Sequence, residues 1–406
     1  MYSQTTAQVV IGAQFGDEGK GRWIDYYAAK NSGDGIVIRF NGGAQAGHTV
    51  VTPDGRRHVF SHVGSGAFAG AKTFLSQFFV CNPILFLKER EKLAALGIKP
   101  VIGVDPASPV TTPYDMMINQ IIEKQRGHDR HGSCGIGFGE TLERHLNLDY
   151  ALEVASLTDK RALTDRLNMI RRDYAPARLA RLGIGDTFAK NADLFQSDAI
   201  LEHYIDDTQH FLEAITVTDL SSATQGQQIL FEGAQGLLLD QHRGFFPYVT
   251  RSHTGLRNVL TLAHELRLEQ LEVTYVTRAY LTRHGAGPLP GELLSKPYSG
   301  VDDLTNVPND YQGTLRFAWL NLDLLGSTIA NDLADADRIL GLTIYPRLAI
   351  TCLDQLGDEL AVYCQSGRRY QGTLEMFVAK VAGSVGIRQI GCGFGAERNA
   401  VQIVTP

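Results

Sequence analysis

The residues with the clearest chemical potential lie in a glycine-rich segment near the N-terminus, VVIGAQFGDEGKGRW, at residues 9–23. Its glycines let backbone N–H groups approach an anion closely, and Lys20 supplies the positive charge that a phosphate binds. Gly21 follows this lysine where a P-loop ATPase has Ser or Thr, which makes an ordinary P-loop ATPase a weak hypothesis. The acids Asp17 and Glu18 precede it. Two functions stay open for Asp17: a ligand of the magnesium that accompanies a triphosphate, or a base that acts on a bound acceptor.

Three further strand-like segments end in polar loops that are rich in glycine. GIVIRF leads into NGGAQAGHT, which contains His48, and QQILFEG leads into AQGLLLDQHRGFFPYVT, which contains Gln235 and Thr250. VTYVTRAYLTR reads as a fourth strand and ends in HGAGPLPGE. A single histidine is more often structural than catalytic, but His48 follows three glycines in a loop, which favours a function. Four such loops together indicate a binding site more strongly than any one of them.

Short apolar strands alternate with longer amphipathic segments along the chain, and this alternation must position the loops. It predicts an α/β fold with a largely parallel central sheet and helices on both faces. The loops then meet at the carboxyl ends of the strands, where ligands of such sheets usually bind. We expect one domain over residues 1–406, with a helical insertion at about residues 149–220.

Composition sets modest limits on function. The chain has 406 residues, a formal net charge of −6 and no long basic tract, which argues against nucleic acid or an anionic membrane as a main partner. The sequence shows no long apolar run and no cationic leader, so we expect a cytoplasmic protein. Its five cysteines are scattered and never spaced as CxxC, which predicts reduced thiols and not a disulfide framework or a zinc site.

Four motifs together resemble the adenylosuccinate synthetase family: GAQFGDEGKG, RFNGGAQAGHTV, LFEGAQGLLLD with FPYVT, and RAYLTRHGAGPLPGE. Their order and approximate spacing follow that family from residue 9 to about residue 292, and weaker similarity continues to the C-terminus. The resemblance implies a P-loop-related fold and a Mg²⁺-dependent ligase that joins IMP to L-aspartate. In that reaction GTP phosphorylates the purine 6-oxygen, and the aspartate amine then displaces the phosphate.

The resemblance also implies roles for individual residues. Asp17 matches the base that removes the N1 proton of hypoxanthine, and His48 matches the residue that stabilises charge during phosphoryl transfer. Lys20 matches the lysine on the donor phosphates, and Gln235 matches the glutamine near the purine 6-position. Asp17 and the carbonyl of Gly47 match the magnesium ligands.

Three binding sets follow from the same resemblance. The residues matched to IMP binding are Asp17, Gln45, Ser133, Arg144, Gln235 and Thr250. The residues matched to donor nucleotide binding are Gly16, Glu18, Gly19, Lys20, Gly21, Asp354, Gly393 and Gly395. The residues matched to aspartate binding are Thr305, Thr314 and Arg316. Arg144 matches an arginine that the family offers to the nucleotide of a partner subunit, which implies a homodimer with shared sites.

The sequence departs from the family at positions that set specificity. Cys352 replaces a lysine of the strand end TKLD, whereas Asp354 remains and can accept hydrogen bonds from guanine, so GTP is favoured over ATP as the donor. Of several consecutive arginines that grip aspartate, only Arg316 remains, and Thr314 stands where another is expected. Two further arginines could contribute to that site: Arg278 and Arg283.

These departures leave alternatives to the IMP–aspartate reaction. The first is a paralogue that performs the same chemistry on another purine nucleotide, for example dGMP, or with another amine, with GTP or ATP. Asp17, retained as in the IMP-using enzymes, argues against dGMP. The second is a catalytically silent nucleotide-binding protein. Because the phosphorylating residues are complete, an active enzyme is favoured.

Overall fold

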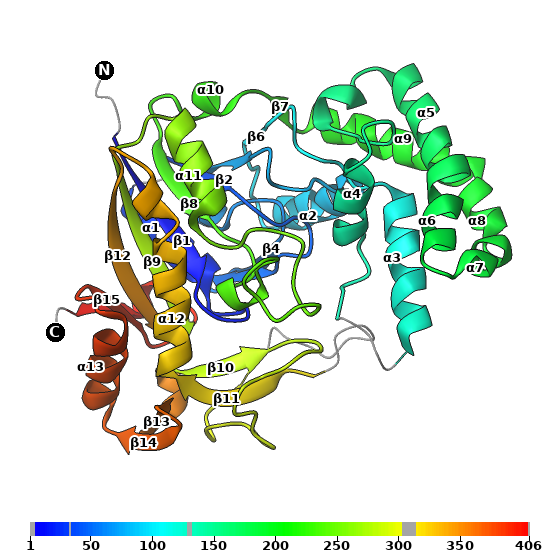
Figure 1. The fold of residues 1–406 in the computed structure, drawn as a ribbon. Helices are drawn as coiled ribbons and strands as arrows, with labels where there is room; N and C mark the ends of the chain where they lie inside the picture. Colours follow the sequence, from blue (N-terminus) through cyan, green and yellow to red (C-terminus); the bar gives the residue numbers. More distant parts are fainter. Residues whose placement is uncertain (1–4, 32–33, 128–131, 303–313, 405–406) are drawn as a thin grey trace.

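A ten-stranded sheet forms the centre of the protein in the computed structural model, which describes residues 5–31, 34–127, 132–302 and 314–404 (Figure 1). In spatial order its strands are β16 (Val401–Val404), β15 (Ile390–Gly393), β12 (Thr343–Thr351), β9 (Gln270–Arg278), β1 (Thr6–Gly12), β8 (Gln228–Glu232), β2 (Gly35–Arg39), β5 (Lys72–Leu75), β6 (Ile102–Val104) and β7 (Thr216–Val217). Neighbouring strands are parallel except β15 and β16, which are antiparallel. The predicted largely parallel sheet is confirmed.

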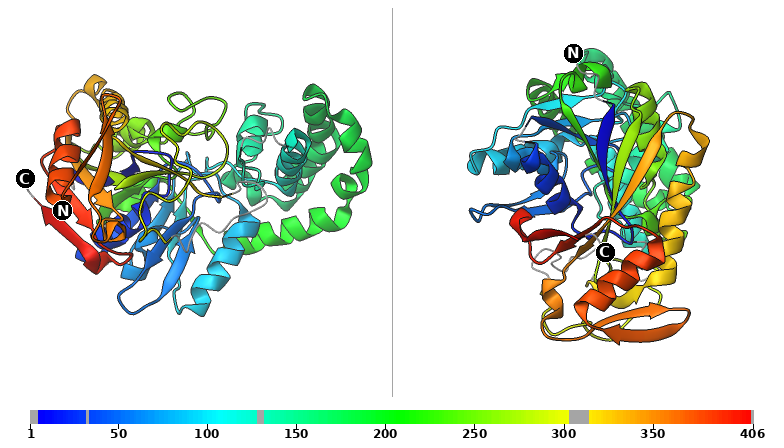
Figure 2. Two further views of the ribbon diagram at one scale, coloured as in Figure 1. Left: turned by 90° about the horizontal axis from the view of Figure 1, so that it is seen from below. Right: turned by 90° about the vertical axis from the view of Figure 1, so that its left-hand side faces the viewer.

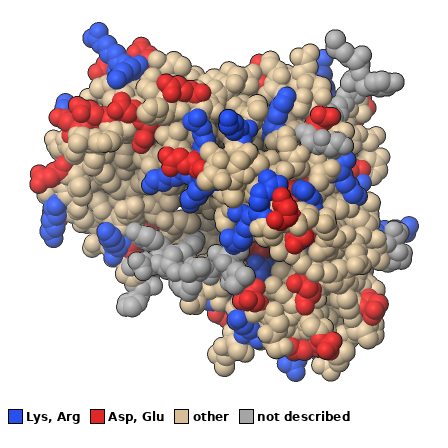
Figure 3. Space-filling model, turned by 180° about the vertical axis from the view of Figure 1, so that it is seen from behind, with Lys and Arg blue, Asp and Glu red and all other residues tan. Residues whose placement is uncertain are grey.

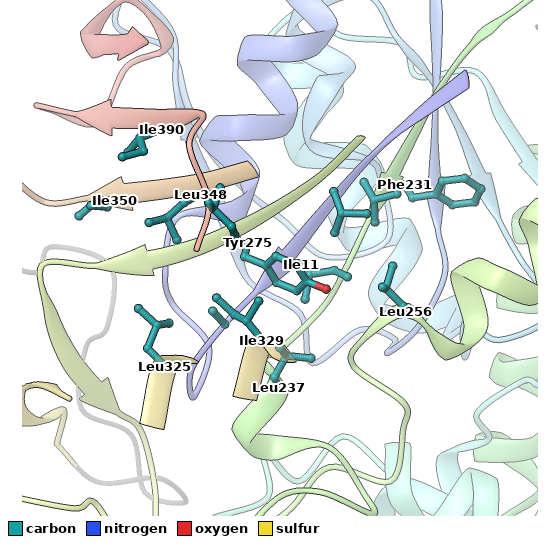
Figure 4. Close-up of a cluster of buried hydrophobic side chains, with 14 of the residues drawn as sticks. Ile11, Phe231, Leu237, Leu256, Tyr275, Leu325, Ile329, Leu348, Ile350 and Ile390 are labelled. Atoms are coloured by element: carbon teal, nitrogen blue, oxygen red, sulfur yellow. The ribbon is translucent and has the colours of Figure 1, made fainter. Parts of the chain in front are cut away.

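Both faces of the sheet are buried, because side chains of a strand point alternately to its two sides. Val9 and Ile11 of β1 join the large core on one side, whereas Val10 packs with the helix α1 (Lys20–Lys30) on the other. The large core also contains side chains of three helices, α11 (Leu256–Glu265), α12 (Leu322–Leu333) and α13 (Leu374–Val385). Figure 4 shows this core, in which Ile11 and Tyr275 of the sheet lie near Ile329 of α12. Helices therefore cover both faces, as predicted.

A second, four-stranded sheet lies below the central one, in the order β10 (Tyr280–Arg283), β11 (Arg316–Asn321), β13 (Ala361–Gln365) and β14 (Arg368–Gly372) (Figure 1). It corrects one prediction. The segment VTYVTRAYLTR is not one strand, because β9 ends at Arg278 in the central sheet and β10 begins in the second sheet. The backbone N–H of Ala279, between them, donates to the carbonyl of Thr351 at the end of β12. A two-stranded hairpin, β3 (His48–Val51) with β4 (Arg57–Phe60), completes the sheets among the described residues.

Most of the remaining helices form a group at the end of the molecule opposite α13, β13 and β14 (Figure 2). They are α2 (Pro83–Ala95), α3 (Pro113–Arg126), α4 (Phe138–His145), α5 (Lys160–Met169), α6 (Ala175–Arg181), α7 (Gly185–Lys190), α8 (Ala192–Gln196) and α9 (Asp198–Glu213). The short helix α10 (Leu220–Thr224) lies instead beside the central sheet, where Leu220 joins the large core. The predicted insertion at about residues 149–220 is largely helical, but α3 and α4 precede it. One buried cluster joins this group to β5 and β6 of the sheet. Within the described residues, we find no helix with the length and apolar character that crossing a membrane requires.

Candidate active site

The glycine-rich loop after β1 folds around the carboxylate of Glu18. Oε1 of Glu18 accepts hydrogen bonds from the backbone N–H groups of Gln14, at 3.0 Å, and Gly16, at 2.9 Å. Its Oε2 lies 2.7 Å from Nζ of Lys20, and both side chains are almost fully buried. Glu18 thus holds the loop from inside, so the structure places it beneath the predicted phosphate site and not on its surface.

Two glycines of this loop have backbone conformations that other residues rarely adopt. Gly16 and Gly19 have φ angles of 91° and 92°, and Gly19 immediately precedes α1. The N–H groups at the start of α1 have no partners within the helix, and the helix dipole favours an anion there. With Lys20 as the first residue of α1, this end of the helix can bind the phosphates of a nucleotide.

His48 is fixed by a buried acid of the neighbouring strand. Nδ1 of His48 lies 2.6 Å from Oε1 of Glu232, which is the last residue of β8. Glu232 also accepts hydrogen bonds from the backbone N–H of Ser65, at 3.0 Å, and from its hydroxyl. Burial alone would raise the pKa of Glu232, but Arg39, His48 and Ser65 together lower it to about 2. Glu232 is therefore ionised, and it orients the imidazole of His48 with Nδ1–H toward itself.

Asp17 is partly buried in the first loop and has a left-handed conformation, with a φ of 60°. Nε of Arg278, the last residue of β9, donates to its carbonyl oxygen at 2.6 Å. Burial raises the pKa of the Asp17 carboxyl, while Arg278, Lys20 and His284 act in the opposite direction. A carboxylate with a raised pKa is a stronger base, which suits it to remove a weakly acidic ring proton.

The start of α1, which follows the loop after β1, is in direct contact with the start of β3, which follows the loop after β2. A Cβ added at Gly21 would lie 2.9 Å from Cβ of His48, so only glycine leaves room for this approach. The structure thus brings Lys20 and His48 to one place, as the sequence predicted, with Asp17 on the same loop as Lys20.

Two amides beside these loops have polar atoms without partners among the described residues. They are Gln45, with both Oε1 and Nε2 buried and unpaired, and Gln235, with Oε1 in the same state. Both face the glycines after β2: Oε1 of Gln45 lies 3.1 Å from a Cβ position at Gly43, and Oε1 of Gln235 lies 3.3 Å from one at Gly42. Buried polar atoms are normally hydrogen-bonded, so these amide atoms are available to water or to a polar ligand.

Ser133 and Thr250, also predicted to bind IMP, are each held by a hydrogen bond within the chain. The hydroxyl of Ser133 donates to Oδ1 of Asn119 at 2.9 Å, so this side chain already has a partner inside its own chain. The loop that carries Ser133 contacts Gly43 through Phe138, and it contacts Gly285 through Gly132. The N–H of Thr250 donates to the carbonyl of Leu239 at 2.8 Å, which holds Thr250 close to the loop of Gln235.

Arg144 is not at the site where the resemblance placed it. Its guanidinium is fully buried and pairs with both carboxylate oxygens of Asp115, at 2.8 and 2.9 Å. It also donates to the carbonyl oxygens of Val110 and Tyr150. With these partners it stabilises the packing of α4 on α3, and it is not exposed to the nucleotide of a partner subunit. The predicted IMP-binding role of Arg144 is therefore wrong for this structure.

The predicted aspartate site is described in part. Thr305 lies outside the described residues, and Thr314 is exposed. Arg316 donates to the carbonyl of Gly287 at 2.6 Å and to Oε2 of Glu292 at 3.1 Å, while its buried Nε has no partner among the described residues. Arg283 lies opposite Arg316 in the second sheet.

Arg283 has a structural role. Its three nitrogens donate to the carbonyl oxygens of Ala286, Pro288 and Tyr248. Burial, with a further effect of Arg316, lowers its pKa to about 10. Arg316 is therefore the better candidate for a substrate carboxylate.

The predicted base-binding residues lie at the ends of β12 and β15. The hydroxyl of Thr351 donates to the carbonyl of Glu18 at 2.8 Å, which joins this end of the sheet to the phosphate loop. The N–H of Leu353 donates to the carbonyl of Gly393 at 3.1 Å, so the segments of Asp354 and Gly395 adjoin. Asp354 is exposed at the rim, and Gly393 is buried.

Comparison with known proteins identifies the family. The family model described as adenylosuccinate synthetase matches residues 9–358. The chain belongs to the adenylosuccinate synthetase family. The adenylosuccinate synthetase of Picrophilus torridus is 34% identical over 355 residues, which cover 86% of this chain and 77% of that protein. That of Desulfosudis oleivorans is 30% identical over 384 residues, which cover 92% and 83%.

Two solved structures share the fold of this adenylosuccinate synthetase family member. The fully ligated adenylosuccinate synthetase of Plasmodium falciparum has a TM-score of 0.75 at 20% identity and covers 98% of this chain and 100% of its own. The succinoaminodeoxyadenylate synthetase of cyanophage S-2L, bound to dGMP and dATP, has a TM-score of 0.60 at 16% identity and covers 99% and 96%.

The two candidate metal ligands have the oxygen chemistry that Mg²⁺ takes in proteins. The described residues contain no group of three or more His, Cys, Asp or Glu side chains that could hold an ion. The candidates Asp17 and the exposed Gly47 offer one carboxylate and one carbonyl oxygen. Mg²⁺ typically takes one or two carboxylates and completes its coordination with phosphate oxygens and water.

Sequence reasoning missed three residues of this site. Glu232 lies in the apolar strand QQILFEG and was not considered. An acid in a buried strand is rarely left unpaired, so its position alone could have indicated a partner or a function. His284 follows Arg283 and has a buried Nδ1 without a partner among the described residues. Arg22 stands two residues after Lys20, and only the folded chain shows that it reaches the segment of Gly395.

Proposed function

We propose that this protein forms adenylosuccinate from IMP and L-aspartate with GTP as the phosphoryl donor. The observation that carries the proposal is the contact of Gly21, next to Lys20 at the start of α1, with His48 at the start of β3. Asp17 lies on the loop that leads into α1. Membership of the family supports the reaction class. Phosphoryl transfer needs mainly positioning and charge stabilisation, and these loops supply both.

In the first step, the Asp17 carboxylate accepts the N1 proton of hypoxanthine, which leaves the purine 6-oxygen nucleophilic. That oxygen attacks the γ-phosphorus, and the bond to the β-phosphate oxygen breaks to release GDP. Lys20 and the start of α1 bind the donor phosphates, and the imidazole of His48 stabilises charge on the transferred group. The carboxylate of Asp17 and the carbonyl of Gly47 would hold Mg²⁺, which neutralises phosphate charge when it is bound.

In the second step, the amine of aspartate attacks carbon 6, and the 6-oxygen leaves with the phosphate. Gln45 and Gln235 supply the unpaired amide atoms that hydrogen-bond the purine through both steps. Arg316 binds a carboxylate of aspartate, for which its unpaired Nε is available. Although the chain is negatively charged overall, Lys and Arg side chains gather in the middle of the face in Figure 3, as anionic substrates require.

One alternative acceptor has a precedent among the solved structures that share this fold. The cyanophage enzyme that shares this fold is bound to dGMP. If this chain used dGMP, the amine would attack carbon 6 of guanine, and the product would keep the 2-amino group of that base. We further propose a cytoplasmic location and a homodimer. Because Arg144 is buried in its own chain, any shared site needs another residue.

The decisive experiment uses IMP with oxygen-18 at the 6-position, together with L-aspartate, GTP and Mg²⁺. Adenylosuccinate should form, and the released phosphate should carry the label, because the 6-oxygen leaves with it. Unlabelled phosphate would exclude a 6-phosphoryl intermediate. Product with dGMP but not with IMP would favour the alternative acceptor, and nucleotide binding without any product would indicate a silent protein.

A further inference from the structure

Arg22 has an unusual environment for a charged residue. It is the third residue of α1, and only 5% of its surface is exposed. Its Nη1 donates to the carbonyl of Gly395, whereas Nε and Nη2 are buried and have no partner among the described residues. A Cβ at Gly393 would collide with Nη2, so the guanidinium lies directly against the backbone of residues 393–395.

Two unpaired nitrogens on a buried guanidinium need an explanation. Buried polar groups are nearly always hydrogen-bonded, and an unpaired one costs free energy. Burial lowers the pKa of Arg22, whereas Cys352 and Asp354 act in the opposite direction, so these two residues lie near it. An arginine remains charged under these conditions and can only donate hydrogen bonds. A ligand with an acceptor atom would satisfy it.

Arg22 lies beside the segments to which the family resemblance assigns the donor base, residues 352–354 and 393–395. Lys20 and the start of α1 mark the phosphate end, and Arg22 lies further along the helix. The ends of β12 and β15 lie around Arg22. The hydroxyl of Thr351 donates to the carbonyl of Glu18, and the N–H of Leu353 donates to the carbonyl of Gly393. Asp354 belongs to the same region, at the exposed rim.

The edge of guanine offers neighbouring groups of opposite kind. Its N1–H and 2-amino group are donors, which a carboxylate such as that of Asp354 can accept. The adjacent O6 and N7 are acceptors, and arginine is the residue that most often binds this pair. Adenine has an amino group in place of O6, so it would present a donor to a guanidinium that can only donate.

We propose that Arg22 donates to O6 of the donor guanine and, with Asp354, selects GTP over ATP. This inference rests on the proposed function, since it assumes that the donor binds along α1. Cys352 stands where the family resemblance has a lysine, so that position has no positive charge here. The proposal assigns this charge to Arg22. Because Gly393 lies directly against Nη2, the backbone of this segment must shift outward when the base binds, and O6 then accepts from Nη2, one of the two unpaired nitrogens.

The test measures binding of nucleoside diphosphates by calorimetry, which does not depend on turnover. The probes are GDP, 6-thioguanosine diphosphate, IDP and ADP. Sulfur at position 6 weakens the acceptor but keeps N1–H and the 2-amino group, whereas IDP keeps O6 and lacks the 2-amino group. We expect the unmodified protein to bind GDP about 5- to 100-fold more tightly than ADP, the range for one good arginine–guanine contact.

In Arg22→Met the preference for GDP over 6-thioguanosine diphosphate should disappear, while the preference for GDP over IDP remains. Asp354→Asn should do the reverse. Arg347→Met is the matched control, because Arg347 pairs with Glu272 away from this site, and it should change neither ratio. Circular dichroism and the melting temperature establish that each variant is folded.

Two results would overturn the inference. One is an Arg22→Met variant that binds all four probes more weakly by the same factor, as expected if Arg22 only supports the segment of Gly395. The other is an unmodified protein that binds ADP as tightly as GDP. Failure of the proposed function is a separate result: the protein would then bind GDP with these ratios but form no adenylosuccinate.

Discussion

Nδ1 of His48 lies 2.6 Å from Oε1 of Glu232, and both side chains are buried. Because Glu232 is ionised, it accepts a hydrogen bond from Nδ1–H of His48. Nε2 of His48 is then the atom that can contact the substrate. Burial, the larger effect, lowers the pKa of His48 even though Glu232 raises it. In the ligand-free protein, His48 is therefore neutral near pH 7, with Nε2 unprotonated.

We expect His48 to take up a proton when nucleotides bind. The phosphate groups bring negative charge next to the imidazole, which raises its pKa and lets Nε2–H donate. Calorimetry of GDP and IMP binding near pH 7, in buffers with different ionisation enthalpies, should show uptake of up to about one proton. His48→Asn should remove most of it. Binding heats that do not depend on the buffer would contradict this prediction.

Replacing Asp17 by Asn should abolish turnover and leave nucleotide binding largely intact. Asn tolerates a φ of 60° better than most residues, so the loop keeps its shape while it loses the base. Loss of a general base typically costs about 100- to 10,000-fold in rate. Steady-state rates and GDP affinity, measured on the same preparation, check this. A near-normal rate would make Asp17 a structural or metal-linked residue.

Replacing Glu18 by Gln should make the protein more dependent on nucleotide for its stability. The variant keeps an oxygen that accepts the loop N–H groups, but Lys20 loses the charge 2.7 Å away. Breaking a buried ion pair typically costs about 3–5 kcal/mol. We expect a lower melting temperature without ligand and a larger increase upon GDP binding than in the unmodified protein. An unchanged melting temperature in both conditions would show that Glu18 does not hold Lys20.

The sequence predicted the centre of the fold well because buried parallel strands have a strong apolar pattern. The four predicted strands contain the contiguous set β9, β1, β8 and β2. The second sheet was not predicted, since no local pattern shows that the chain leaves one sheet after Arg278 and enters another at Tyr280. Glycines that follow apolar strands are a local signal, which is why the site loops could be found.

Side-chain partners far apart in the sequence could not be predicted. The pairing of Glu232 with His48 joins residues 184 positions apart. Arg144 has the sequence context of an exposed helix residue, and only the folded chain places Asp115 against it. The contact of Arg22 with Gly395 spans 373 positions. Such pairs depend on the packing of elements, which periodicity does not specify.

The buried carboxyl of Asp332 should make stability depend on pH. Burial raises its pKa to about 6, although it accepts hydrogen bonds from the N–H of Leu256 and the hydroxyl of Tyr275. Its folded pKa exceeds the unfolded one, so its contribution is present below about pH 4 and is lost as pH rises through 6. Relative to Asp332→Asn, the unmodified protein should gain on the order of 2 kcal/mol between pH 7 and 4. Chemical unfolding of both proteins across this range measures the difference, and equal pH profiles would contradict it.

Replacing Arg316 by Ala should weaken aspartate binding far more than IMP binding. A hydrogen bond to a charged group is worth about 1.5–3 kcal/mol, which corresponds to a KM for aspartate that is about 10- to 150-fold higher. Glu292→Gln is the matched control. It removes the negative charge of the carboxylate whose Oε2 lies 3.1 Å from Nη1 of Arg316, and it leaves Arg316 itself unchanged. That variant should bind aspartate as tightly as the unmodified protein or more tightly, since the guanidinium is freed for the substrate. If Arg316→Ala raised both KM values equally, its contact with the carbonyl of Gly287 would be its main role, and another residue would bind the amino acid.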